Sequence, residues 1–259
     1  MVSDGGWEYL STWVYAGSLD EAGMLCKGTK RRGGAARMAR HPRTPATQPE
    51  ERPRWVTGGA TILTFVALLY LVELIDQLTR HSLDLNGIRP LQTDGLWGII
   101  FAPLLHANWA HLMANTVPLL VLGFLMTLAG LARFVWATAI VWILGGFGTW
   151  LIGNVGSSCG PTDHIGASGL IFGWLAFLLV FGLFVRKVWD IIIGLAVLFF
   201  YGGILLGALP RLGVCGGVSW QGHLCGALAG VVAAYFLSAP ERKARELKKA
   251  GERPSSPKT

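Results

Sequence analysis

The stretch Gly166-Ala167-Ser168-Gly169 stands directly after a polar loop and at the head of a long apolar run, Leu170 to Val185. A run of this kind predicts a membrane helix, so the serine lies at the helix start. Backbone N–H groups without partners and the positive end of the helix dipole favour negative charge there. An oxyanion forming beside a serine nucleophile would be stabilised at that point. The alternative interpretation is a packing motif, in which small residues let two helices approach closely.

The composition is that of a membrane protein. Of the 259 residues, 52% are hydrophobic and 14% charged, and the mean hydropathy is +0.48. Soluble domains carry about 25% charged residues. Apolar runs of about 20 residues can cross a bilayer, and this chain contains several.

We predict an all-α polytopic protein with six transmembrane helices. The expected spans are Val56–Ile75, Ala107–Leu128, Phe134–Ile152, Ala167–Val185, Ile191–Leu209 and Val218–Leu237. Residues 55–238 would form the membrane domain. Residues 1–54, rich in Gly, Arg, Pro and Thr, would be a disordered basic cytoplasmic tail, and residues 239–259 a second basic cytoplasmic tail.

The net charge is +7 and the pI about 9.5, but the position of the charge argues against nucleic acid as a partner. Of the 22 Lys and Arg residues, 19 fall in the two tails and in the loops that share their side. The exceptions are Arg80, Arg89 and Arg211. This asymmetry predicts both termini in the cytoplasm of a plasma-membrane protein, with Ser168 near the outer end of its span. The tails would also contact anionic lipid.

The second span opens with two polar residues on one helix face, His111 and Asn115. Polar side chains inside a span are costly and usually face the bundle interior or a water-filled cavity. Interhelical hydrogen bonding is the alternative role. Because the pair lies at the depth of Ser168, we expect it to belong to a site.

The sixth span supplies His223, followed by the small-residue pair Gly226 and Gly230. A histidine near a serine is the standard means of activating a weak hydroxyl nucleophile. No acidic residue sits in a span where it could orient His223. We therefore expect a Ser-His dyad rather than a triad, with Asp163 a solvated loop residue.

These motifs together resemble the rhomboid family of intramembrane serine proteases, in their actinobacterial form. Gly166-Ala167-Ser168-Gly169 is similar to the GxSG motif of that family. His106, His111 and Asn115 match the HxxxxHxxxN of the second span, and His223 with its glycines matches the sixth. The order of the motifs and their spans agree over residues 56–237.

The resemblance implies a role for each matched residue. Ser168 would attack the scissile carbonyl, and His223 would act as general base and then general acid. The backbone N–H of Ser168, with His111 and Asn115, would hold the oxyanion. Supporting roles would fall to His106, which would steady the loop or retain water, and to Gly166, Gly169 and Gly226, which would permit close approach of backbones.

Two positions depart from the family pattern. A Trp-Arg pair common in the first loop is Trp97-Gly98 here, which puts the stabilisation of that loop in doubt. The tyrosine that some members place beneath the histidine ring is Phe172, which can pack against the ring but cannot donate a hydrogen bond. In the same first loop, the apolar stretch 96–105 is too short to span, so we expect a structured element at the outer leaflet.

The remaining reactive residues leave alternatives open. Cys159 and Cys215 fall in outer loops and would form a disulfide or stay free thiols, whereas Cys225 is expected in the core. Asp163 and His164 with His106 and His111 raise a metal site as an alternative. No HExxH is present and the catalytic pattern already accounts for His111, so no metal or cofactor is expected.

Glu73 and Asp76, at the outer end of the first span, are expected to face water. Met38 is a second candidate for the start of translation, so residues 1–37 are in question.

The sequence thus predicts a serine endopeptidase that cleaves transmembrane segments of membrane proteins. A non-catalytic binder of membrane helices is the first alternative, and a transporter that uses the same polar residues is the second. The chain has no internal repeat, and its polar span residues gather at the outer end, which favours the enzyme. The sequence specifies neither substrate nor oligomeric state.

Overall fold

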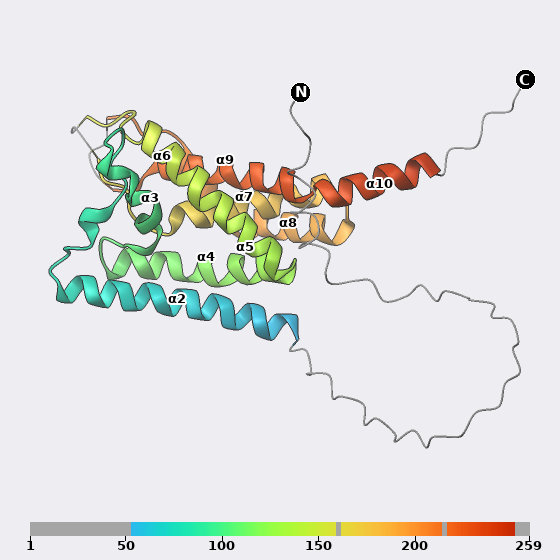
Figure 1. The fold of residues 1–259 in the computed structure, drawn as a ribbon, viewed down its shortest axis with the longest axis horizontal. Helices are drawn as coiled ribbons and strands as arrows, with labels where there is room; N and C mark the ends of the chain where they lie inside the picture. Colours follow the sequence, from blue (N-terminus) through green and yellow to red (C-terminus); the bar gives the residue numbers. More distant parts are fainter. Residues whose placement is uncertain (1–52, 159–161, 214–216, 252–259) are drawn as a thin grey trace, which may run out of the picture. The chain divides into compact units, whose positions relative to one another are not determined.

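The computed structural model describes residues 53–158, 162–213 and 217–251, and within them the only regular secondary structure is helical. Six helical segments are long and apolar enough to cross a membrane (Figure 1). They are α2 (Arg54–Leu78), α4 (Trp109–Leu128), α5 to α6 (Leu131–Ile152), α7 (Ser168–Val185), α8 with η5 (Val188–Ala208) and α9 (Trp220–Leu237). All six predicted spans are therefore confirmed, each within a few residues of its expected bounds.

Helix α7 forms the centre of the bundle. Two thirds of its apolar window (67%) is buried, the largest share of any span in the described ranges. It packs against α4, α8 and α9, while α2 lies along α4 at the edge of the bundle (Figure 1). The reason lies in its sequence, which has no charged residue and alternates large side chains such as Trp174 and Phe177 with small ones.

Helices α7 and α9 approach each other through glycines. A Cβ atom on Gly226 would collide with the carbonyl oxygen of Gly169, and one on Gly230 with that of Gly173. Only glycine leaves room for two backbones at this distance. The motif residues of the two helices are thus brought together by backbone contact.

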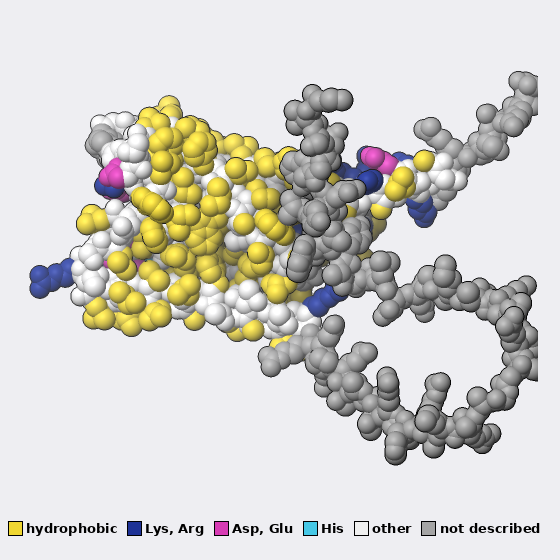
Figure 2. Space-filling view, in the orientation of Figure 1, with side chains coloured by type: hydrophobic (Ala, Val, Ile, Leu, Met, Phe, Trp, Pro, Cys, Tyr) yellow, Lys and Arg dark blue, Asp and Glu magenta, His cyan; other side chains and the backbone are white. Residues whose placement is uncertain are grey.

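The visible face of the bundle is covered by hydrophobic side chains, with charged side chains gathered toward its two ends (Figure 2). Several of the outward-facing residues are large, including Leu63, Val135, Leu195 and Phe199. A soluble protein rarely exposes so continuous an apolar surface. This band is what a lipid-facing surface requires.

The loop after α2 contains the structured element expected there. It is built from η1 (Asp84–Asn86), η2 (Asp94–Leu96), α3 (Gly98–Phe101) and η3 (Ala102–Leu104). Two tryptophans on the third span hold it: Trp142 Nε1–H donates to the Ile99 carbonyl at 2.8 Å, and Trp150 Nε1–H to the Gln92 carbonyl at 2.8 Å. These bonds stabilise the loop although Gly98 replaces the arginine of the family pattern.

A further helix, α10 (Ala239–Gly251), follows α9 and extends past the bundle (Figure 1). Arg245 donates to the carbonyls of Phe184 and Val185, the last residues of α7, at 3.1 Å each. A cation at a helix C-terminus satisfies carbonyls that lack partners and complements the dipole. Glu241 adds an ion pair with Arg133, so the basic C-terminal segment is anchored to the bundle.

The expectation for Glu73 and Asp76 was wrong. Both side chains are buried, with 1% of each residue exposed, because the chain folds back over them after α2 and Leu83 N–H donates to Asp76 at 2.7 Å. Cys225 is buried as predicted. Cys159, Cys215 and residues 1–37 lie outside the described residues, and the domain boundaries stay predictions.

Candidate catalytic site

Ser168 is the first residue of α7 and follows Ala167, the N-cap. The turn before it depends on Gly166, whose φ of 116° is a conformation that side chains disfavour. A Cβ on Gly166 would also lie 2.7 Å from Cε1 of His111. The Gly166 N–H donates to the Ala102 carbonyl at 2.8 Å, which fixes the turn to the loop between α2 and α4. The glycine before the serine is thus required by both conformation and space.

His223 lies in the first turn of α9, against the face of α7 that carries the serine. Phe172 is four residues after Ser168 and therefore shares its helix face. Its ring stacks on the His223 imidazole, with centroids 3.9 Å apart and planes inclined by 12°. A Cβ added to Gly169 would lie 3.5 Å from the carbonyl oxygen of Gly222, so the two helices are also close at this level. The structure therefore places His223 against the helix face of α7 that begins with Ser168.

The proton of His223 can be assigned from its hydrogen bond. Nδ1 lies 3.0 Å from the carbonyl oxygen of Gly207 in η5. Since a carbonyl oxygen only accepts, Nδ1 carries the hydrogen and the neutral ring keeps a lone pair on Nε2. Nε2 is buried and has no hydrogen-bond partner among the described residues. This arrangement leaves Nε2 available as a base.

The residues predicted on α4 converge on the same turn. Asn108 caps the helix by accepting from the His111 N–H at 2.9 Å, which starts α4 just before His111. Both His111 and Asn115 flank the position of Gly166, and Asn115 is buried, with Nδ2 unpartnered among the described residues. A buried amide N–H without a partner is costly unless a ligand completes it.

His106 lies against the serine turn, and the supporting role that the family resemblance implies for it stays a prediction. Its Nε2 lies 3.4 Å from the backbone nitrogen of Ala167, the residue before Ser168. Burial lowers the pKa of His106 to about 4, and the nearby His111 ring adds to the effect. The ring is therefore neutral at pH 7, so its Nε2 can accept the Ala167 N–H.

Sequence reasoning missed a polar network centred on His164. Its Nε2 lies 2.8 Å from Oγ1 of Thr162, and its Nδ1 lies 2.7 Å from Oγ of Ser219, the N-cap of α9. Ser219 accepts from Gly222 N–H at 3.0 Å, and the Thr162 hydroxyl can donate to Asn154 Oδ1 at 3.1 Å. With Nε2 protonated and Nδ1 accepting, every group is satisfied. The network joins the loop before the nucleophile to the start of the helix that carries His223.

Two features could have pointed to His164: it lies four residues before Ser168, and a serine stands just before the sixth span. No local pattern reveals that they meet, because their contact spans 55 residues of sequence. An antiparallel bridge between Ile88 and His164, with N–O distances of 3.0 Å in both directions, also ties this loop to the loop between α2 and α4.

A small cavity of about 50 Å³ adjoins Ser168. Its polar walls are Ser168, Thr149, His164 and Ser219. A water molecule needs about 10–15 Å³ of such space and two to four polar partners. The cavity can therefore hold water next to the serine.

The metal site that the sequence analysis raised as an alternative does not form among the described residues. Asp163, His164, His106 and His111 do not bring their ligand atoms into one cluster. Asp163 is exposed, and both ring nitrogens of His164 face hydroxyl groups.

These features define a helical membrane protein in which Ser168, His223 and Asn115 lie at the same end of the bundle, with the histidine and the asparagine buried. Residues 93–240 match the Rhomboid domain family. The chain therefore belongs to the rhomboid family, and it is a multi-pass membrane protein.

The relatives agree with this assignment. The chain is 82% identical to the uncharacterized protein Rv1337 of Mycobacterium tuberculosis over 232 residues, which cover 88% of this chain and 97% of the relative. It is 33% identical to the Bacillus subtilis protein named "Putative rhomboid protease YdcA" over 123 residues, which cover 43% of this chain and 58% of the relative.

Proposed function

We propose that this protein is an intramembrane serine endopeptidase that cleaves transmembrane segments of other membrane proteins by a Ser168–His223 dyad. The observation that carries the proposal is the fixed tautomer of His223. Its Nδ1–H is held by Gly207, and its free Nε2 lies beside the helix face of Ser168. Membership of a family that includes a protein named as a protease supports the same activity.

The chemistry divides into two steps. His223 Nε2 takes the proton of Ser168 as its Oγ attacks the scissile carbonyl carbon, and then gives that proton to the departing amine as the C–N bond breaks. Water from the adjoining cavity then attacks the ester carbonyl, with Nε2 again accepting a proton and returning it to Oγ. Product acid and amine are released, and the dyad is restored.

The oxyanion of each tetrahedral intermediate needs hydrogen-bond donors. We assign this role to the Ser168 N–H at the start of α7, to His111 and to the unpartnered amide of Asn115. Removing one such donor costs about 10²–10³ in rate in other serine hydrolases. Asn115→Ala is therefore expected to slow cleavage by that factor while Ser168 stays reactive.

The setting of the reaction follows from the charge asymmetry. We assign both termini to the cytoplasm of the plasma membrane and the site to the outer half of the bilayer. The substrate is a membrane-spanning protein whose helix must unwind to present a carbonyl, which Gly or Pro in that helix would ease. Lipid is the other partner, and no cofactor or nucleic acid is required.

The test compares wild type with Ser168→Ala and His223→Ala, purified in detergent and incubated with a single-span substrate that carries Gly and Pro in its outer half. Thr61→Ala is the matched control, since it removes a hydroxyl that bonds within α2. Mass spectrometry of the products should show cleavage by wild type and the control, and a loss of at least about 10³-fold in both site variants.

The outcomes separate the alternatives. Equal cleavage by Ser168→Ala would overturn the serine mechanism. Labelling by a fluorophosphonate probe then reports on Ser168 without a substrate. A wild-type protein that is neither labelled nor active on a panel of such substrates would instead be a non-catalytic binder of membrane helices.

A further inference from the structure

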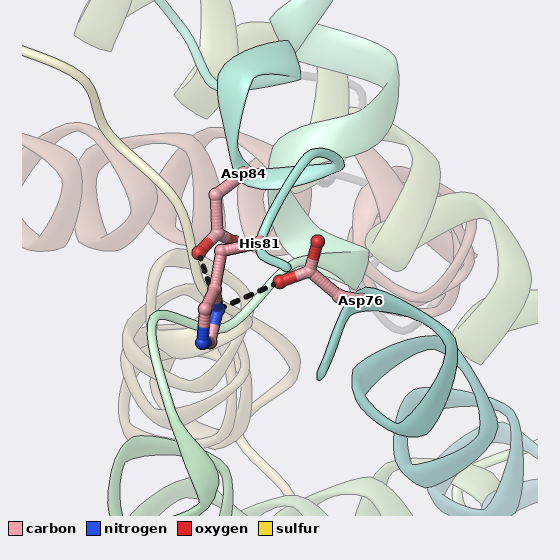
Figure 3. Close-up of side chains that lie close together, drawn as sticks. All are labelled: Asp76, His81 and Asp84. Carbon is pink, nitrogen blue, oxygen red and sulfur yellow. Dashed lines mark hydrogen bonds and ion pairs between the residues drawn. The ribbon is translucent and has the colours of Figure 1, made fainter. Parts of the chain in front are cut away.

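A cluster of potential metal ligands lies where α2 ends, away from the serine. Asp76 in the last turn of α2, His81 just beyond it and Asp84 at the start of η1 point toward one another (Figure 3). His81 Nδ1 lies 3.1 Å from Asp76 Oδ2 and 3.5 Å from Asp84 Oδ2, and one ligand atom from each residue lies within 4.8 Å of the others.

The cluster carries more negative charge than its described partners neutralise. Asp76 and Asp84 form ion pairs with His81, which is charged only when protonated. Burial raises the pKa of Asp84 to about 6, and the charges of Asp76 and Glu73 add to the rise while His81 opposes it. Two carboxylates, one buried and one half-buried, thus share a single imidazole.

Glu73 provides a second, independent observation that points to a bound cation. It lies one turn before Asp76 on the same face of α2, and only 1% of it is exposed. Its Oε1 accepts from Gln77 at 3.0 Å, whereas Oε2 is buried and has no partner among the described residues. It is a neighbour of the cluster on α2, but it is not among the residues whose ligand atoms lie within 4.8 Å of one another. A buried carboxylate oxygen without a donor is expensive, and a bound cation would offset that cost.

The spacing and the ligand types select a class of ion. Zinc binds imidazole nitrogen at about 2.0–2.1 Å and carboxylate oxygen at about 2.0–2.2 Å in tetrahedral geometry, which places neighbouring ligand atoms roughly 3.4 Å apart. The two distances from His81 Nδ1, 3.1 and 3.5 Å, match this value. An imidazole ligand favours zinc and its neighbours over calcium or magnesium, which prefer oxygen. We propose that Asp76, His81 and Asp84 bind a divalent transition-metal cation, best represented by Zn²⁺, with Glu73 contributing negative charge beneath it.

The surroundings make binding feasible. The His81 side chain is 44% exposed, so an ion can enter from water. Leu83 N–H donates to Asp76 Oδ1 at 2.7 Å, which holds one carboxylate in place and leaves Oδ2 facing His81. A metal here would join the end of α2 to the first outer loop.

The experiment is zinc titration of the full-length protein in detergent, by calorimetry in a buffer free of chelators. Wild type is compared with His81→Asn and Asp84→Asn, each of which removes one ligand. Asp94→Asn is the control, because Asp94 is an exposed carboxylate of the same loop that pairs with Arg89. We expect wild type and the control to bind one more equivalent of Zn²⁺ than either variant, or to bind that equivalent at least tenfold more tightly. Zinc should also raise the thermal midpoint of wild type more than that of the variants.

Each other outcome contradicts the proposal. Equal zinc binding by wild type and both variants would place the metal elsewhere, on other histidines or cysteines. Absence of binding by wild type at micromolar Zn²⁺ would leave a hydrogen-bonded Asp-His-Asp cluster. Tighter binding of Ca²⁺ or Mg²⁺ in parallel titrations would overturn the ion class. Asp84→Asn keeps the contact between His81 and Asp76. Its zinc binding therefore tests the proposal even if His81→Asn fails to fold.

Discussion

Helices α7 and α9 on one side, and α8 on the other, are packed in opposite ways. In α7 and α9, 67% and 50% of the apolar window is buried, against 17% in α8. Gly226 and Gly230 leave no room for a Cβ between α7 and α9, and Gly182 leaves none where α7 meets the start of α8, whereas a Cβ on Gly203 in η5, the continuation of α8, meets nothing within 4 Å. Yet η5 also contributes to the surroundings of His223, through Gly207.

The difference separates two requirements of the site, which are the placement of Ser168 and His223 and the tautomer of His223. The serine and the histidine are placed by the rigid contact between α7 and α9, where backbones touch. The segment after α8 contributes a single carbonyl, that of Gly207, which fixes the tautomer of His223. Position thus comes from dense packing, and the tautomer of His223 comes from a peripheral segment, only 17% of whose apolar window is buried.

The largest loss of cleavage outside the dyad itself should follow from filling the contact between the glycines of α7 and α9. Gly230→Leu drives a side chain into the Gly173 carbonyl, which belongs to a helix backbone and cannot move aside. Overpacking costs about 1–3 kcal/mol or more, and we expect about 3 kcal/mol here with loss of cleavage. Thermal unfolding in detergent measures it, with Gly203→Ala as the control. A Gly230→Leu protein as stable as wild type would mean that the two helices are not held by backbone contact.

The next effect tests whether the His164 network belongs to the rigid region. His164→Ala leaves Thr162 and Ser219 without a buried partner, which should cost about 1–3 kcal/mol. Cleavage should slow through a lower kcat, because the start of α9 carries His223. His164→Gln, which can both donate and accept, should recover part of the loss, and Asp163→Asn, an exposed neighbour, should change little. If glutamine and alanine behave alike, hydrogen bonding by His164 is not what positions the helix.

A pH effect of smaller size follows from two buried histidines. Burial lowers the pKa of His106 to about 4 and lowers that of His164, while both take a proton near pH 6.5 when unfolded. Between those values the unfolded chain binds more protons, so stability is full above pH 6.5 and is lost as the pH falls. The slope is at most about 1.4 kcal/mol per pH unit for each histidine.

The titration of Asp84 changes stability with pH in the opposite direction. Its pKa is raised from 3.8 to about 6, so the folded chain binds the extra proton and stability falls as the pH rises through that window. Thermal midpoints measured from pH 7 to pH 5 should therefore fall more steeply in Asp84→Asn than in wild type. They should fall less steeply in His164→Gln. Parallel curves for all three proteins would contradict these assignments.

The sequence predicts the spans and motif positions well because both are local. An apolar run of about 20 residues needs no partner to be recognised, and GxSG with its two companion motifs fixes an order along the chain. The family resemblance placed Phe172 beneath the His223 ring, and the two rings do stack. The chemistry of these residues stays a proposal that cleavage assays must test.

What the sequence could not supply comes from contacts between distant segments. The burial of Glu73 and Asp76 results from the fold of the following loop, which no periodicity reveals. The π-helical segment Val141–Gly145 in the third span and the 3-10 ending of the fifth are likewise set by neighbouring helices. The network of His164 joins residues 55 positions apart.

The smallest effect should be found on α8. Phe199 and Phe200 are 83% and 75% exposed, so their rings face lipid and leave no cavity when removed. Because lipid tails replace the lost contacts, Phe199→Ala should change stability by less than about 0.5 kcal/mol. Phe177→Ala on α7, whose ring is 1% exposed, is the matched variant and should cost about 3–5 kcal/mol. Thermal unfolding of both variants in the same detergent measures the two losses of stability. Similar losses would show that α8 is packed as densely as α7, which would contradict the contrast between these helices.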